Sequence, residues 1–262
     1  MASAPPGADD RPRGAVSVEQ SPTPVPRTKS QSLGTLLFVW GGAFSFLASL
    51  AYGVTFYLGP LGRTIPMRSW ADEAEAVATN IVLFTLFAAH HSLMARARAK
   101  VWLTRVVPSH LERTTYVWVA SLLFLLVCWL WRPVGGELYR LEGALAWGAV
   151  GVQVTGVLLT GAGVHVLNWS ELAGVQAART SGELVFSRGV YGFVRHPLYL
   201  GWMLMTCGTP HLTGGRLVFA AVSALYLLLA IPWEERSLVA EHGESYERYR
   251  ARIRWRVMPG IY

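Results

Sequence analysis

The stretch LGTLLFVWGGAFSFLASLAYGVTFYL, Leu33 to Leu58, contains no Asp, Glu, Lys or Arg. About 20 consecutive apolar residues in a helix are enough to cross a bilayer core of about 30 Å. Three further uncharged windows of comparable length follow at Ala76–Ala95, Thr114–Trp131 and Gly143–Leu167. The sequence therefore predicts four membrane-spanning helices between residues 33 and 167.

The overall composition agrees with a membrane protein. Of the 262 residues, 52% are hydrophobic and only 15% are charged, and the mean hydropathy is +0.34. Soluble domains carry about 25% charged residues. We therefore expect an all-α, polytopic integral membrane protein.

A fifth apolar region runs from Leu198 to Trp233 and contains one charge, Arg216. It is interrupted by GTPHLTGGR, whose Gly and Pro residues are typical of turns. Two helices that fold back on each other account for this pattern better than one long helix. The prediction is thus about six transmembrane helices, the last two forming a hairpin.

The first 32 residues are rich in Pro, Ser and charge, and such segments bury too little apolar surface to become ordered. We expect residues 1–32 to be a disordered tail and residues 33–262 to be one membrane domain. The two cysteines, Cys128 and Cys207, fall within apolar windows, where they are expected to pack as small hydrophobic residues.

The orientation follows from the basic residues in the short loops, because cytoplasmic loops carry more Lys and Arg. The segment Arg96–Arg113 contains five, whereas Gly59–Glu75 and Arg132–Glu142 contain two each. This places the N- and C-termini in the cytoplasm. The net charge of +7 then reflects topology and attraction to anionic membrane lipids, and no nucleic-acid partner is expected.

Ionisable residues recur at the predicted cytoplasmic helix ends. They are His90, His91, His165, His196, Glu234 and Glu235. Charged groups near hydrocarbon are costly and usually line a functional cavity, so we expect a pocket open to the cytoplasm. Each residue alone also has a structural explanation, for example a solvated histidine or an arginine that anchors a helix. No metal site is expected, because adjacent histidines such as His90 and His91 point to different sides of a helix.

GVYGFVRHPLYLG, Gly189 to Gly201, followed by EERSLVAEHGESYERYRARIRWRVMPGIY, Glu234 to Tyr262, resembles the core of the isoprenylcysteine carboxyl methyltransferase superfamily. The matching positions are Arg195, His196, Pro197, Tyr199, Gly201, Glu234, Glu235, Gly243, Tyr246, Tyr249 and Pro259. The resemblance implies a membrane-embedded methyltransferase that binds S-adenosyl-L-methionine. It assigns residues 168–262 to the cofactor-binding catalytic core.

The segment from His90 to Pro133 resembles the branch of NnrU-like proteins and bacterial methanethiol S-methyltransferases. The matching positions are His91, Ser92, Met94, Ala95, Arg96, Pro108, Glu112, Arg113, Thr115 and Tyr116. One departure concerns NWSELAGV, where Trp169 replaces the histidine of the branch and Ala173 replaces an aromatic residue. The acceptor implied is a small thiol, or a membrane-associated thiol or carboxylate.

The resemblance also implies the site. The residues expected to bind the cofactor are Tyr191, Arg195, His196, Pro197, Tyr199, Gly201, Glu234 and Glu235. Arg195 would face the methionyl carboxylate, either glutamate would accept from the ribose or the amino group, and Tyr199 would pack near the sulfonium. Arg195, Tyr199 and His91 are the expected catalytic residues, with His91 receiving the proton of a thiol acceptor.

Two alternatives remain at the level of the sequence. Sterol C14-type reductases share the C-terminal architecture but bind NADPH, and an NnrU-like membrane accessory protein would have no enzymatic activity. A dinucleotide usually requires additional basic residues, which favours methyl transfer. The expected location is a bacterial inner membrane, with the active site facing the cytoplasm.

Overall fold

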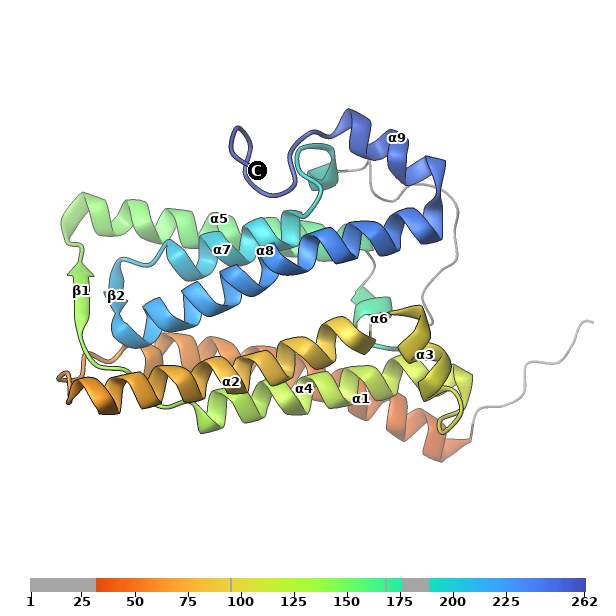
Figure 1. Cartoon of the computed structure of the whole chain (residues 1–262), viewed down its shortest axis with the longest axis horizontal. Coiled ribbons are helices and arrows are strands. Elements are labelled where there is room, and N and C mark those ends of the chain that lie inside the picture. The colour runs from red at the N-terminus through yellow and green to blue at the C-terminus, as the bar shows by residue number, and fades with distance from the viewer. Residues whose placement is uncertain (1–31, 95, 168, 176–188) are drawn as a thin grey trace, which may run out of the picture. The chain divides into compact units, whose positions relative to one another are not determined.

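Long helices make up most of the described chain, as Figure 1 shows. The computed structural model describes residues 32–94, 96–167, 169–175 and 189–262. Residues 1–31 of the predicted disordered tail lie outside this description. Leu33–Tyr262 forms one compact unit.

Six longer helices carry the fold. They are α1 (Leu33–Leu58), α2 (Trp70–Met94), α4 (Glu112–Leu130), α5 (Gly143–Leu167), α7 (Pro197–Cys207) and α8 (Gly214–His242). Shorter helical segments join or follow them: η1 (Pro60–Gly62), α3 (Ala97–Leu103), η2 (Ser109–Leu111), α6 (Trp169–Leu172), η4 (Gly189–Gly192) and α9 (Glu244–Arg252). Two short strands, β1 (Glu137–Arg140) and β2 (His211–Thr213), complete the described structure.

Within the described residues, five helices are long and apolar enough to cross a membrane: α1 together with η1, α2, α4 together with η2, α5 and α8. The sixth predicted span, α7, has 11 residues. At 1.5 Å per residue it extends only about 16 Å. The protein is therefore a polytopic helical membrane protein with five candidate spans, and the predicted number of six is not confirmed.

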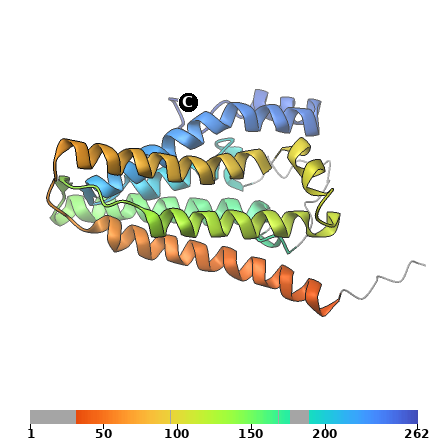
Figure 2. The same cartoon turned by 60° about the horizontal axis from the view of Figure 1, so that its bottom comes forward.

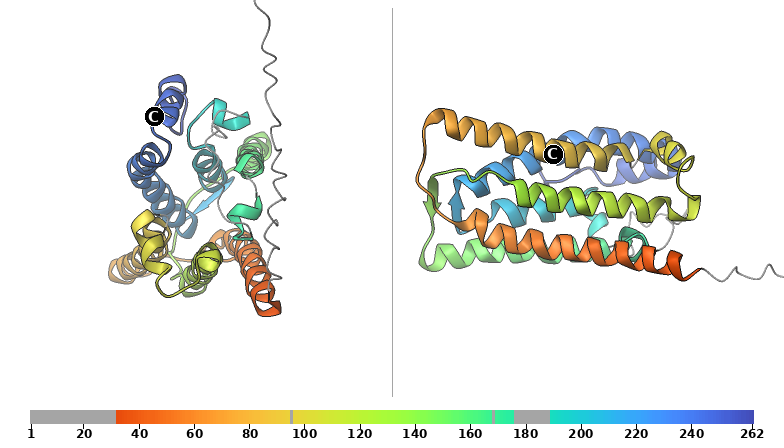
Figure 3. Two further views of the ribbon diagram at one scale, coloured as in Figure 1. Left: turned by 90° about the vertical axis from the view of Figure 1, so that its right-hand side faces the viewer. Right: turned by 90° about the horizontal axis from the view of Figure 1, so that it is seen from below.

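The helices form two layers of three. In one layer α4 lies between α1 and α2, and in the other α7 lies between α5 and α8 (Figures 2 and 3). The layers meet where α2 packs against α8. Large apolar side chains on the outer faces, such as Phe44, Leu86 and Trp147, are exposed, as expected for surfaces that contact lipid.

The predicted hairpin of α7 and α8 is present, and its turn is part of a small sheet. Strands β1 and β2 pair antiparallel, with Glu137 opposite Thr213 and Arg140 opposite His211. The Glu137 carboxylate accepts from Thr64 at 2.6 Å and Arg140 at 2.9 Å. These hydrogen bonds lower the pKa of Glu137 to about 2, so its carboxylate stays ionised. It thereby links strand β1 to the loop that carries Thr64.

Aromatic packing fixes α8 against the first layer. Phe219 of α8 makes edge-to-face contacts with Phe56 of α1, Phe84 of α2 and Trp131 after α4, with ring centroids 5.5 to 6.1 Å apart. Each such pair contributes about 0.5–1.5 kcal/mol beyond the area it buries. Contacts from α1, α2 and the end of α4 therefore fix the position of α8, which carries Glu234 and Glu235 further along its length.

Helices α5 and α7 cross closely at two glycines. A Cβ atom added to Gly201 would lie 2.3 Å from Thr160 Oγ1 and 2.8 Å from the carbonyl oxygen of Gly156. The second of these atoms is backbone and cannot rotate away. Helix packing therefore requires a small residue at Gly201, and its contact with the cofactor stays a prediction.

We expect Gly201→Ala to lower the free energy of unfolding by about 1–3 kcal/mol, because overpacking at a tight crossing forces the helices apart. Denaturant titration in detergent micelles measures this change. Gly148→Ala is the matched control, because nothing lies within 4 Å of its added Cβ. Equal stability of the two variants would contradict this account of the crossing.

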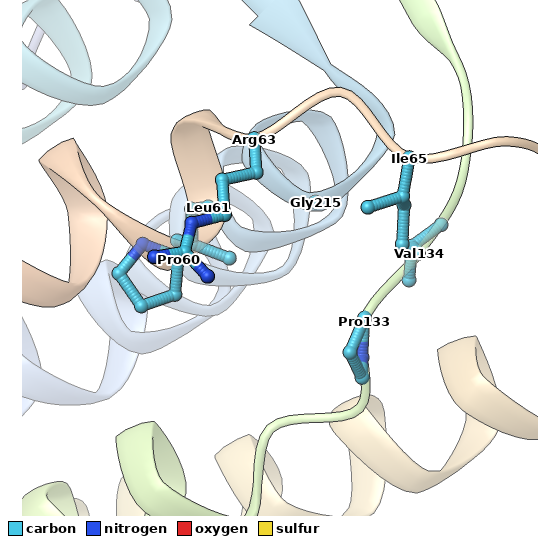
Figure 4. Close-up of a pocket in the computed structure, with 7 residues that line it drawn as sticks. All are labelled: Pro60, Leu61, Arg63, Ile65, Pro133, Val134 and Gly215. Atoms are coloured by element: carbon cyan, nitrogen blue, oxygen red, sulfur yellow. The ribbon is translucent and has the colours of Figure 1, made fainter.

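A pocket lies at the end of the molecule that holds the hairpin turn (Figure 4), with a volume of about 180 Å³. Its lining consists of Pro60, Leu61, Arg63, Ile65, Pro133, Val134 and Gly215. Gly215 stands in the first turn of α8, about 30 Å along the helix from Glu234. This pocket is therefore separate from the predicted cofactor site.

Candidate active site

The residues around Arg195 and the two glutamates of α8 come together at the end of the molecule opposite the sheet. His196 precedes α7 with a non-helical backbone (φ −122°, ψ 64°), and Pro197 is the first helical residue. Proline costs little there because its missing N–H would have no helical partner. The backbone N–H groups of Arg195 and His196 instead donate to the carbonyls of Trp255 at 2.9 Å and Arg256 at 2.8 Å.

Arg195 and Glu235 form a buried ion pair. Nε of Arg195 donates to Oε1 of Glu235 at 2.7 Å, and the two side chains are 7% and 4% exposed. Nη1 of Arg195 donates to the carbonyls of Ile253 at 2.8 Å and Arg254 at 3.0 Å. Burial of a charge requires such partners. These contacts occupy Nε and Nη1 of Arg195, and its contact with a methionyl carboxylate stays a prediction.

The two glutamates have different environments. Oε2 of Glu235 lies 3.4 Å from Nε of Arg256, so both of its oxygens have cationic partners. The Glu234 side chain is 42% exposed and accepts a hydrogen bond of 2.5 Å from the Tyr199 hydroxyl. Of the pair, Glu234 is therefore the carboxylate that a ligand can reach.

His196 lies between the two carboxylates. Its Nδ1 is 3.6 Å from Oε2 of Glu234, and its Nε2 is 3.4 Å from Oε1 of Glu235. The imidazole also stacks on the Tyr199 ring, with centroids 5.2 Å apart and an interplanar angle of 18°. Both rings are therefore held in place beside the exposed Glu234.

Three tyrosines beneath this group are packing residues. Tyr191, Tyr246 and Tyr249 are buried, and the Tyr249 hydroxyl donates to the carbonyl of Tyr191 at 2.9 Å. Burial raises the pKa of each phenol, so all three stay neutral. Tyr191 supports the segment before α7, and its contact with the cofactor stays a prediction.

His91 lies on the last turn of α2 and is exposed. Its Nδ1 is 2.8 Å from the hydroxyl of Tyr116 on α4, and the ring of His90 stacks on Tyr116 at 5.9 Å. His91 is thereby held against α4 in the first layer, and Glu234 lies on α8 of the second layer, which packs against α2.

Helix α8 is hydrogen-bonded to the end of α2 that carries His91. The hydroxyl of Tyr226 donates to the carbonyl of Ala88 and is hydrogen-bonded to the hydroxyl of Ser92. These two contacts fix the end of α2 that carries His91 relative to the helix that carries Glu234. The sequence did not assign Tyr226 a role, since a tyrosine within an apolar run has no distinguishing pattern.

Three other singled-out positions lie in the last turn of α5 and directly after it. His165 is exposed in the last turn of α5, Trp169 is exposed in α6, and Ala173 is fully buried. Within the described parts of the chain, no three His, Cys, Asp or Glu side chains are grouped so that they could hold a metal ion.

The chain is similar to known membrane methyltransferases. The model of the isoprenylcysteine carboxyl methyltransferase (ICMT) family matches residues 158–240. Methanethiol S-methyltransferase 2 of Bradyrhizobium diazoefficiens is 36% identical, over 84% of this chain and 88% of the relative. The methanethiol S-methyltransferase of Mycobacterium tuberculosis is 33% identical, over 83% and 94%.

A more distant relative shares only part of the chain. Protein-S-isoprenylcysteine O-methyltransferase of Schizosaccharomyces pombe is 35% identical over 82 residues, which is 30% of this chain and 35% of the relative. No solved structure matches the chain.

Proposed function

Because the chain belongs to the isoprenylcysteine carboxyl methyltransferase family, in the branch of the methanethiol S-methyltransferases, we propose that it transfers a methyl group from S-adenosyl-L-methionine to methanethiol. The observation that carries the proposal is the exposed Glu234 carboxylate, held by Tyr199 beside His196. The same helix is hydrogen-bonded, through Tyr226, to the turn of α2 that carries His91.

The side chains at this end fit the chemistry of the donor. S-Adenosyl-L-methionine supplies a methyl group on a cationic sulfonium and also carries hydroxyl and amino groups. A reachable carboxylate such as Glu234 accepts hydrogen bonds from hydroxyl or amino groups. The face of an aromatic ring such as Tyr199 attracts a nearby cation. The buried Arg195–Glu235 pair and Pro197 then act as positioning residues that hold this surface.

The acceptor requires a different group. In methyl transfer to a thiol, the carbon–sulfur bond of the sulfonium breaks with its electron pair going to the donor sulfur, and a bond forms to the acceptor sulfur. The thiol proton must also leave, and we assign it to Nε2 of His91. This assignment needs a hydrogen on Nδ1, and the Tyr116 hydroxyl 2.8 Å away can accept from it.

We further propose that the site faces the cytoplasm of a bacterial inner membrane. The basic segment Arg96–Arg113 includes α3, which lies at the same end of the helices as α9 (Figure 1). Excess Lys and Arg mark the cytoplasmic side. Methanethiol is small and apolar, so it can reach this end from either the membrane or the aqueous phase.

Headspace gas chromatography of the detergent-purified protein tests the proposed function. With S-adenosyl-L-methionine and methanethiol supplied, we expect dimethyl sulfide and S-adenosylhomocysteine in equal amounts. If S-adenosylhomocysteine forms without dimethyl sulfide when cell lipids are added, the acceptor is a different one. If neither product forms with thiol, lipid or carboxylate acceptors, the proposal is wrong.

Glu234→Gln should raise the KM for S-adenosyl-L-methionine by roughly 10- to 100-fold, because hydrogen bonds to a charged group are worth about 1.5–3 kcal/mol. Tyr199→Phe removes only the hydroxyl that donates to Glu234 and should have a smaller effect. Initial rates of S-adenosylhomocysteine formation measure both. Glu241→Gln, an exposed position on the same helix, is the control and should leave KM unchanged. A Glu234 variant that behaves like this control would remove Glu234 from the donor site.

A further inference from the structure

Two arginines contact Glu235, and only one of them is accessible. The Arg195 side chain is 7% exposed, whereas the Arg256 side chain is 33% exposed with its Nε 3.4 Å from Oε2 of Glu235. The guanidinium carbon of Arg256 lies 4.9 Å from the centre of the Tyr262 ring. Among the described residues, no acceptor is hydrogen-bonded to its terminal nitrogens.

Arg195 cannot take a further anion without loss elsewhere. Its Nε and Nη1 already make one ion pair and two hydrogen bonds to carbonyls within the protein. Withdrawing this guanidinium would leave a buried carboxylate undercompensated, which is strongly unfavourable. Only Nη2 of Arg195 is without a hydrogen bond to another described residue, and the side chain is 7% exposed, so a more accessible arginine is better placed to supply the cation for a bound carboxylate.

The amino-acid end of a methyl donor carries a carboxylate and an ammonium group on the same carbon. Its recognition requires an anion and a cation side by side. Oε2 of Glu234 is 3.6 Å from Nδ1 of His196. The Arg256 guanidinium contacts Oε2 of Glu235, and the other oxygen of this carboxylate is 3.4 Å from Nε2 of His196. Glu234 therefore contacts one nitrogen of the His196 imidazole directly, and Arg256 is linked to the other nitrogen through Glu235.

We propose that Arg256, and not Arg195, binds the carboxylate of the methyl donor, while Glu234 binds the ammonium group. This inference rests on the proposed function, since it takes the donor to be S-adenosyl-L-methionine. A planar guanidinium held by Glu235 through Nε keeps its two terminal nitrogens for a carboxylate, which they can bind in a bidentate manner.

Equilibrium binding of two ligands tests the proposal: S-adenosyl-L-methionine and its decarboxylated form, which retains the sulfonium and the amine. In Arg256→Gln, we expect the Kd for S-adenosyl-L-methionine to rise roughly 10- to 100-fold and the Kd for the decarboxylated form to stay unchanged. Arg254→Gln is the matched control, because the Arg254 side chain is exposed and lies over the Trp255 ring. This control should preserve both affinities.

The decarboxylated ligand also reports whether the variant is folded. An equal loss for both ligands, or no loss for either, would overturn the role of Arg256. If Arg256→Gln does not accumulate in membranes, Arg256→Lys replaces it in the binding measurements. A severalfold loss of the preference for S-adenosyl-L-methionine over its decarboxylated form supports the role of Arg256. An unchanged preference overturns this role. Failure of the wild-type protein to bind either ligand would instead count against the proposed function.

Discussion

Arg195→Met is expected to lower the free energy of unfolding by about 3–5 kcal/mol, because it leaves the buried Glu235 carboxylate without its closest cation. The variant also loses the two hydrogen bonds that tie Ile253 and Arg254 to the start of α7. Titration with denaturant in detergent micelles, monitored by tryptophan fluorescence, measures the change. Donor binding should fall with it, because the C-terminal segment is no longer held beside His196.

An exposed ion pair provides the matched control. Arg248 and Glu244 lie 3.2 Å apart, but their side chains are 71% and 92% exposed, so Arg248→Met should leave stability unchanged within error. The double variant Arg195→Met/Glu235→Met removes both buried charges and should recover part of the loss. If Arg195→Met proves as stable as Arg248→Met, the buried pair does not hold the site together.

His91→Ala is expected to slow methylation of methanethiol by about 100- to 10,000-fold at neutral pH, the usual contribution of a general base. The loss should shrink as the pH rises, because the thiol then ionises in solution and no longer needs a base. It should also be smaller with a carboxylate acceptor, which carries no proton at neutral pH. Rates of S-adenosylhomocysteine formation across a pH series measure these differences.

His110→Ala provides the comparison for this variant, since His110 is exposed in η2 and stands outside the proposed site. It should retain the wild-type rate at every pH. A loss in His91→Ala that is the same at all pH values, and the same for thiol and carboxylate acceptors, would mean that His91 supports the structure of the α2 end and does not accept the proton.

The helical membrane fold was predictable because burying a charge in lipid is costly, so membrane-spanning helices appear in the sequence as long windows without charged residues. The windows beginning at Leu33 and Gly143 coincide with α1 and α5. The short length of α7 was not predictable in the same way. Residues 198–233 contain one charge, Arg216, and α7 ends at the turn predicted at GTPHLTGGR, but apolar composition does not show whether the segment before this turn crosses the membrane.

The sequence pattern identified candidate site residues but not the contacts between them. Arg195 and Glu235 stand 40 positions apart, and the pattern alone does not show that they neutralise each other. Arg256 is one of several arginines near the C-terminus, so nothing in the sequence distinguishes it from Arg254. The structure is needed to distinguish the buried Arg195, which pairs with Glu235, from the partly exposed Arg256, which we propose binds the donor carboxylate.

Isothermal titration of the detergent-purified protein with S-adenosylhomocysteine and with NADPH tests the central claim most directly. The methyl-donor site predicts one molecule of S-adenosylhomocysteine bound per chain, weaker binding in Glu234→Gln, and no heat from NADPH. Heat from NADPH and none from S-adenosylhomocysteine would contradict it, because the surface around Glu234 would then serve a reductase.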